Sequence, residues 1–303
     1  MALPNVNITL ANGTLGQTLQ TADGVAGIVL TGATEGTVTA GTPFTIQSLA
    51  NAQALGLTQT NNAYALKHIQ EYFNEAGNGA TLYVLIVPNT LKVTNVCDQT
   101  NVNGAVKLLN YAGGVIRLLG IAIDDTQVGT ITVTNGLNAD VYTALASMQA
   151  MATTYFGQQT PFRAVIGGTS FSGTATALTN QTTNASNRVS IVIGDTISTG
   201  PNAAVGLLLG RLSAIPVQRK VSRVKTGQLT TLAAYINGTD AAKYTSTATV
   251  HDRGYITFRT FSGKSGYFFT GDDTCKAATD DYNVLARGRV IDKADTGLCH
   301  LCK

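Results

Sequence analysis

Two patterns of apolar and polar positions alternate along the first two thirds of the chain. Near-continuous apolar runs cover residues 25–30, 80–87, 115–123, 162–166 and 188–194. Runs of this length are typical of strands that are buried on both faces of a parallel sheet. Helical spacing of apolar residues, or a helix-like composition, covers residues 48–55, 61–77, 101–110, 140–156 and 202–216. Strands that alternate with helices predict an α/β fold of mixed α+β character, with a central mixed sheet flanked by helices.

The pattern changes after Lys225, where we expect a division of the chain. Residues 229–237 and 241–244 have the composition of short helical pieces. Residues 255–261 then alternate with a period of two, a glycine-containing turn follows, and the aromatic residues 267–269 return as a second strand. This arrangement predicts a β-hairpin with a long loop.

A helix is expected to begin after the hairpin, near Asp280. Thr279 is a candidate N-cap, and Asp280 and Asp281 fall in the first turn, where the helix dipole favours negative charge. One face of this helix collects four residues at helical spacing: Val284, Leu285, Gly288 and Ile291.

The N-terminal residues 1–21 read as an extended arm. Val6, Ile8 and Leu10 alternate with polar residues, so that a strand with one apolar face precedes a flexible linker rich in Gly, Thr and Gln. A strand that a linker separates from its domain has unpaired backbone edges and is expected to pair with another strand. Its partner belongs either to the same chain or to a neighbour.

The composition points to a protein whose surface is covered by other subunits. Charged residues make up only 12% of the chain, while hydrophobic residues make up 44%; an ordinary soluble monomer has about a quarter charged residues. The alternative is an Ala/Thr-rich α/β protein of ordinary behaviour. The net charge of +3 gives no argument for nucleic acid as a partner, and the apolar runs are too short for insertion into a membrane. No secretion signal is present at the N-terminus, which favours synthesis in the cytoplasm.

No catalytic or cofactor signature emerges from the sequence, so we expect neither an enzyme nor a bound cofactor or metal. Gly263-Lys264-Ser265 lacks the earlier glycine and the following helix of a phosphate loop. Cys299 and Cys302 have the spacing of half a zinc site without a second half, and an unstructured tail is the expected alternative. The best enzymatic candidate is the pair Asp124 and Asp125 at the end of an apolar strand, where α/β proteins bind ligands. A solvated strand end is the commoner meaning of such a pair.

Three segments in this order resemble the core domain of contractile tail sheath proteins of phages and of related injection systems. They are an extended arm that leads into residues 24–32, the Ala- and Gly-rich helix of residues 202–216 with the basic segment 217–225 behind it as a crossing strand, and the hairpin and helix of residues 249–294. The resemblance implies a sheath-like core. It also implies a structural subunit that polymerises around an inner tube and contracts to drive this tube through a target cell envelope.

The resemblance also implies a set of binding partners and of contact residues. The chain would bind copies of itself in a helical polymer, the tail tube protein and baseplate components, and it would be assembled in the cytoplasm of the bacterial host and end in the virion tail. Val6, Ile8 and Leu10 would form an inter-subunit strand. Two basic sets are candidate contacts with the tube or a neighbour, the first on the expected strand and the second on the last helix: Arg219, Lys220 and Arg223, and Arg287, Arg289 and Lys293.

The end of the chain departs from the sheath pattern, which continues with more helix and a final strand. Ala294 is followed by nine residues that contain two of the four cysteines, and we expect a truncated chain with an atypical tail. A divergent sheath that ends early is the alternative.

The expected division is an arm (residues 1–21), an α/β sheath domain (22–225), a core-closing hairpin and helix (226–294) and the tail (295–303). The rival hypothesis is an α/β enzyme or small-molecule-binding protein with its site near Asp124, Asp125 and Gly167.

Overall fold

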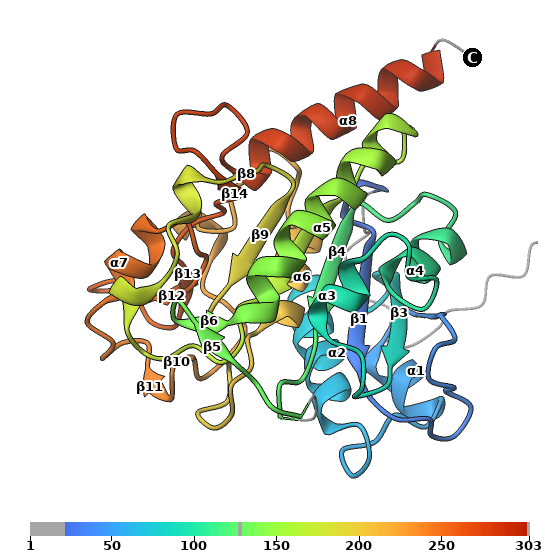
Figure 1. Cartoon of the computed structure of the whole chain (residues 1–303), viewed down its shortest axis with the longest axis horizontal. Coiled ribbons are helices and arrows are strands. Elements are labelled where there is room, and N and C mark those ends of the chain that lie inside the picture. Colours follow the sequence, from blue (N-terminus) through green and yellow to red (C-terminus); the bar gives the residue numbers. More distant parts are fainter. Residues whose placement is uncertain (1–21, 127–128, 302–303) are drawn as a thin grey trace, which may run out of the picture.

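The computed structural model describes residues 22–126 and 129–301, and a six-stranded sheet lies at its centre (Figure 1). The strands follow the order β2-β3-β1-β4-β7-β9. They are β1 (Ala26–Thr31), β2 (Phe44–Ile46), β3 (Leu82–Val87), β4 (Leu118–Ala122), β7 (Arg163–Gly167) and β9 (Val189–Val192). Only β2 is antiparallel to its neighbour within this sheet. The expected mixed sheet is therefore confirmed, and the apolar runs form its parallel strands.

The parallel strands have a doubly wound order. β1 lies between β3 and β4, with Val29 paired to Leu85 on one side and to Ile121 on the other. The chain therefore moves first to one side of β1 and then to the other, which places a topological switch point at the carboxyl ends of β1 and β4. All six residues of β1 are buried, as expected for a central strand with helices on both faces.

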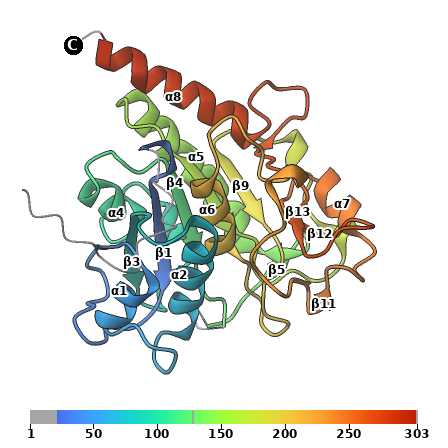
Figure 2. The same ribbon diagram turned by 180° about the vertical axis from the view of Figure 1, so that it is seen from behind.

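Helices cover both faces of the sheet, as Figures 1 and 2 show from opposite sides. α2 and α6 pack together on one face, while α3, α4 and α5 cover the other. The helices of this part are α1 (Leu49–Ala54), α2 (Ala63–Ala76), α3 (Val93–Cys97), α4 (Ala105–Tyr111), α5 (Ala139–Gly157) and α6 (Val205–Ala214). None of the helices in residues 22–126 and 129–301 is long and apolar enough to cross a lipid bilayer.

The contact between α2 and α6 depends on two glycines of α6. A Cβ atom added to Gly206 would lie 2.2 Å from the carbonyl oxygen of His68, and one added to Gly210 would lie 2.5 Å from that of Tyr72. The two helix backbones are therefore closer than any side chain at these positions allows. This explains why the helix is rich in small residues.

Smaller elements gather beyond β9, at the left of Figure 1. The expected hairpin is present as the antiparallel pair β12 (Phe258–Arg259) and β13 (Phe268–Phe269). The remaining short strands are β5 (Val133–Thr134), β6 (Leu137–Asn138), β8 (Ala185–Ser186), β10 (Tyr235–Ile236), β11 (Thr239–Asp240) and β14 (Cys275–Lys276). The short helices are η1 (Ala22–Gly24), η2 (Ala175–Ala177), η3 (Gln181–Thr183), η4 (Val224–Thr226) and α7 (Thr247–Asp252).

Two expectations for residues 217–244 are wrong. Residues 217–225 form turns and η4 in place of a crossing strand, with backbone hydrogen bonds from Arg219 N to Pro216 O (2.9 Å) and from Arg223 N to Lys220 O (3.2 Å). The two expected helical pieces are replaced by the β10–β11 hairpin and turns. Asn237 and Gly238 form the hairpin turn with positive φ angles of 48° and 73°, as this dipeptide favours.

The last helix, α8 (Leu285–Leu301), begins later than expected. Thr279, Asp280 and Asp281 lie in turns before it, and the carboxylate that accepts a hydrogen bond at its N-terminus belongs to Asp272, from Ala286 N (3.1 Å). Ile291 is 42% exposed and not part of the buried face. The buried residues of the part of α8 whose side chains are described are Leu285, Ala286, Gly288, Arg289 and Asp292.

The backbone of residues 295–301 continues α8, so the expectation of an unstructured tail is wrong for this stretch. The inter-subunit strand with Val6, Ile8 and Leu10 lies outside the described residues, and so do Cys302 and Lys303. The division of the chain after residue 225 stays a prediction.

Candidate functional site

A buried ion cluster fixes α8 to the edge of the sheet. Asp292 of α8 accepts hydrogen bonds from Arg163 of β7 (Nε to Oδ2, 2.7 Å; Nη2 to Oδ1, 3.1 Å), and Arg188 lies 3.1 Å from the same carboxylate. Arg163 and Asp292 are 2% and 4% exposed. Arg188 also lies over the ring of Phe156, 4.0 Å from its centre. One carboxylate therefore holds two arginines, one from β7 and one from the turn before β9.

Further polar contacts set the position of α8 on the body. A Cβ atom at Gly288 would lie 2.3 Å from Cζ of Arg163, so this glycine makes room for the guanidinium. Arg289 is 4% exposed and donates to Ile215 O (3.3 Å). Burial lowers the pKa of Arg289 to about 10. These contacts join α8 to β7 and to the residue that follows α6, and the cap from Asp272 joins its N-terminus to the loop after β13.

The structure brings the basic loop, defined here as residues 216–225, against one side of α8. Lys220 Nζ lies 4.0 Å from Asp272 Oδ1 at the N-terminus of the helix. Val217 lines a small cavity together with Lys293, which pairs with Asp23 (2.7 Å). Lys220, Arg223 and Lys293 are exposed, and Arg219 is half-buried. The basic loop thus lies along α8, with Lys220 near the N-terminus of the helix and Val217 near Lys293.

Arg287 and Arg289 have different surroundings. Arg289 is directed into the body, so it is not one of the exposed basic residues. Arg287 is two residues earlier, about 200° away around the helix, and it lies on the outer side of α8 near Asn283 (3.5 Å). The tube or neighbour contacts of these residues stay a prediction.

Asp124 and Asp125 lie at the switch point of the sheet and are buried rather than solvated. Asp124 Oδ1 accepts from Thr126 N (3.0 Å) and from Asn202 Nδ2 (3.1 Å). Asp125 accepts from Asn138 Nδ2 (2.9 Å) and from Ser170 Oγ (2.7 Å), and burial raises its pKa. Both carboxylates tie the loops after β4, β7 and β9 together, which is the arrangement of structural acceptors.

A pocket of about 530 Å³ opens beside Asp124, with Thr31, Asn62 and Tyr64 in its lining. This is the place at which doubly wound sheets bind ligands. Gly167, the last residue of β7, is not in this lining. The three residues of the rival site therefore do not converge on one cavity.

The family model described as DUF2586, N-terminal domain, matches residues 3–273. The chain belongs to this family. No match was found among curated protein sequences.

The fold of this DUF2586 chain is similar to that of solved contractile sheaths. The helical sheath of the anti-feeding prophage in its contracted state matches with a TM-score of 0.60 and 15% identity, over 99% of this chain and 76% of that chain. The contracted sheath complex of an extracellular contractile injection system, PVC, matches with 0.59 and 12%, over 99% and 74%. A chain of the anti-feeding prophage baseplate, 6-fold symmetrised, matches with 0.60 and 16%, over 99% and 75%. The expected sheath-like fold is confirmed.

Sequence reasoning missed a second buried charge cluster, at the contact of α2 with the loop after β9. Lys67 of α2 lies 3.4 Å from Glu71 and also pairs with Asp195, which comes from that loop. Glu71 Oε1 accepts from Thr196 Oγ1 (2.5 Å), and His68 is fully buried beside it. Burial alone would raise the pKa of Glu71, but Lys67 and then His68 and Thr196 lower it to about 2. In the sequence, Lys67 and Glu71 are four positions apart, which is the spacing of an ordinary surface pair on a helix. The contact with Asp195, far away in the sequence, is what makes the pair part of a cluster.

This cluster predicts a loss of stability in acid. Burial, and then Lys67, lowers the pKa of His68 in the folded chain. As the pH falls below 6.5, the unfolded chain therefore binds a proton at His68 before the folded chain does, and this lowers the stability. The folded pKa of Glu71 is depressed, so its contribution is present above 4.5 and is lost as the pH falls towards 2. The free energy of unfolding in urea should therefore decrease from pH 7 to pH 3. Glu71→Gln should lower stability at pH 7 and flatten the slope below pH 4.5.

A suitable control is Asp252→Asn, because this aspartate is exposed. The control should keep the wild-type slope. A Glu71→Gln protein whose pH profile runs parallel to that of the wild type would contradict the assignment.

Proposed function

We propose that this chain is a structural subunit of a contractile sheath, from a phage tail or a related injection system. The observation that carries the proposal is the likeness of fold to contracted sheaths over 99% of the chain. The low content of charged residues, 12%, suits a subunit that is covered by its neighbours. The role is mechanical, and no enzymatic activity or cofactor is part of the proposal.

The mechanism that we propose is a change between two packings of the same subunits. Copies stack around an inner tube in an extended packing, and a trigger allows them to rotate and slide into a packing of lower free energy. Interfaces that have two stable arrangements convert the difference in free energy into movement of the tube. The tail tube protein and baseplate components are the proposed partners beside the copies of the chain itself, with assembly in the bacterial cytoplasm.

Two parts of the chain are proposed to hold the polymer together. The strand with Val6, Ile8 and Leu10 adds to a sheet of a neighbouring copy, since backbone pairing keeps subunits connected while their other contacts change. The basic loop, with Arg219, Lys220 and Arg223, and Lys293 of α8 contact the tube or a neighbour. Arg287 on the outer side of α8 suits a neighbour. Arg289 is not included, because its side chain is buried.

The arm gives the first test of the proposal. Replacement of Val6, Ile8 and Leu10 by Lys removes the apolar face of the strand, so that polymers should no longer form. Sedimentation and negative-stain microscopy of the full chain measure the result: tubes or large polymers for the wild type, and small species for the variant.

The matched control changes the other face of the same strand. Replacement of Asn5, Asn7 and Thr9 by Ser should leave assembly unchanged. Equal assembly of both variants would contradict the role of the strand. A wild-type chain that stays monomeric at every concentration would contradict the sheath function itself.

A further inference from the structure

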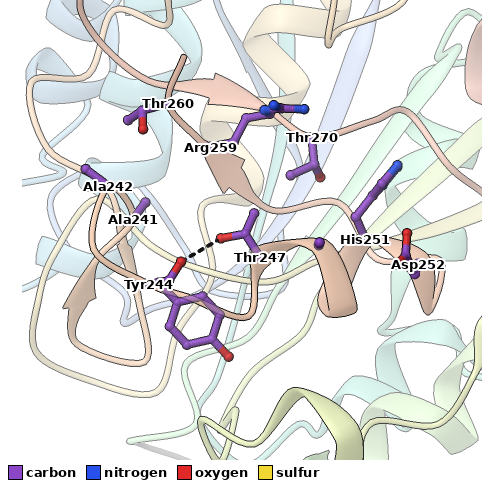
Figure 3. A pocket seen from close by; sticks show the side chains of 10 residues that line it. Ala241, Ala242, Tyr244, Thr247, His251, Asp252, Arg259, Thr260 and Thr270 are labelled. Carbon is purple, nitrogen blue, oxygen red and sulfur yellow. Dashed lines mark hydrogen bonds between the residues drawn. The ribbon is translucent and has the colours of Figure 1, made fainter. Parts of the chain in front are cut away.

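A pocket of about 340 Å³ lies between α7 and the β12–β13 hairpin (Figure 3). α7 contributes Thr247 and His251 to its lining, and the hairpin contributes Arg259 and Thr270. Figure 3 shows Thr270 between the side chains of Arg259 and His251. The lining therefore combines polar side chains with alanines and contains two basic groups.

Arg259 is exposed, and its guanidinium is held in place by stacking on an aromatic ring. Its guanidinium lies over the ring of Phe261, 4.0 Å from the ring centre. Within residues 22–126 and 129–301, this guanidinium has no hydrogen bond or ion pair to another side chain. A planar guanidinium that stacking holds in place and that keeps its donors free is suited to a carboxylate.

The second basic group of the lining, His251, already has an acidic partner. Its Nδ1 lies 3.1 Å from Asp273 Oδ2. The contact with Asp273 raises the pKa of His251, against burial and the opposing charge of Arg259. Asp252 is the acidic group in the lining, and Asp273 is already paired with His251. The charges of His251 and Asp273 cancel within their pair, and the other charged groups of the lining are Arg259 and Asp252. Arg259 is therefore the group whose donors are left to bind an incoming carboxylate.

The same chain carries an exposed acidic segment of matching chemistry. The loop between β14 and α8, residues 277–284, projects from the body beside the start of α8 (Figure 1). Asp280 of this loop is 3.5 Å from Lys276. Asp281 is exposed, and within the described residues its carboxylate has no ion pair. Tyr282 next to it is 37% exposed, which supplies an apolar anchor for a contact.

We propose that the loop of residues 277–284 of one copy enters the pocket between α7 and the β12–β13 hairpin of a second copy, with Asp281 bound by Arg259. The inference rests on the proposed sheath function, because it concerns a contact between subunits. In this proposal the loop of each copy enters the pocket of the next copy, so the contact is head-to-tail. A head-to-tail contact that does not close into a ring generates an open helix, the symmetry of a sheath.

The contact is testable without any polymer. A fluorescently labelled peptide of residues 277–284 is titrated with the full chain and followed by anisotropy. Saturable binding is expected, and it should weaken at least tenfold for a peptide with Asn in place of Asp280 and Asp281. Arg259→Gln should cause a loss of similar size, while Lys264→Gln, an exposed base on the loop of the same hairpin, should not. Equal binding of both peptides, or an unchanged Arg259→Gln protein, overturns the proposal.

A charge exchange in the full chain separates this contact from the sheath function. Arg259→Asp and Asp281→Arg should each reduce the polymer that sediments, and the combination should restore it because the pair is re-formed with opposite polarity. A double variant that is no better than either single variant overturns the pairing. Peptide binding to a chain that never polymerises would support the pocket and contradict the sheath function.

Discussion

Asp292→Ala should lower the free energy of unfolding by about 3–5 kcal/mol, the range for removing one partner of a buried ion pair. Asp292 is the carboxylate that Arg163 and Arg188 share, and these arginines are 2% and 7% exposed. Their removal from water is compensated by this partner, for Arg163 also by Asn187 O (2.7 Å), and for Arg188 also by the ring of Phe156. The variant leaves two positive charges side by side in the interior. Urea unfolding, followed by circular dichroism, measures the loss.

Lys293→Ala on the next position of α8 is the matched control. It also removes one member of an ion pair, with Asp23, but the side chain of Lys293 is 59% exposed. Exposed pairs contribute about 0–1 kcal/mol, so the control should stay close to the wild type. An Asp292→Ala protein within about 1 kcal/mol of the wild type would show that α8 is not held by this cluster.

The sheet is the part of the fold that the sequence predicts well. A strand such as β1 is buried on both faces, so it is a continuous apolar run that the sequence alone identifies as a strand. Glycine and proline residues near such runs indicate where the strands end. α1 is similar, because its cap is local: Ser48 accepts a hydrogen bond from Asn51 N (3.1 Å). Asn62, in contrast, precedes α2 but bonds Ala33 across the chain, with Oδ1 accepting from Ala33 N (2.8 Å). The side chain of Asn62 therefore does not cap α2, and a capping rule that considers only neighbouring residues does not describe it.

The residues after 225 were predicted less well because their elements are short and depend on long-range contacts. β10 and β11 have two residues each, too few for a periodic pattern, and the Asn237-Gly238 turn was the only local signal. The start of α8 was misplaced because its cap, Asp272, is separated from Ala286 by 14 positions. The polar clusters were missed for the same reason: Arg163 and Asp292 are 129 positions apart. Only the fold brings such charges together.

Gly206→Ala should lower the free energy of unfolding by about 2–3 kcal/mol, although alanine favours a helix over glycine by about 1 kcal/mol. The new methyl group would meet the carbonyl oxygen of His68 at 2.2 Å and its Cα at 2.7 Å. These are backbone atoms of α2, so that relief requires the two helices to separate. Thermal and urea unfolding would both report the loss.

The matched control is Gly157→Ala at the end of α5, where an added Cβ has no atom within 4 Å. There the gain in helix propensity is unopposed, and the variant should be as stable as the wild type or slightly more stable. The same substitution is thus expected to act in opposite directions at two helical positions. Equal effects would mean that α2 and α6 are not in backbone contact. Opposite effects would establish the close approach of these helices, which also places Lys67 and Glu71 against the loop after β9.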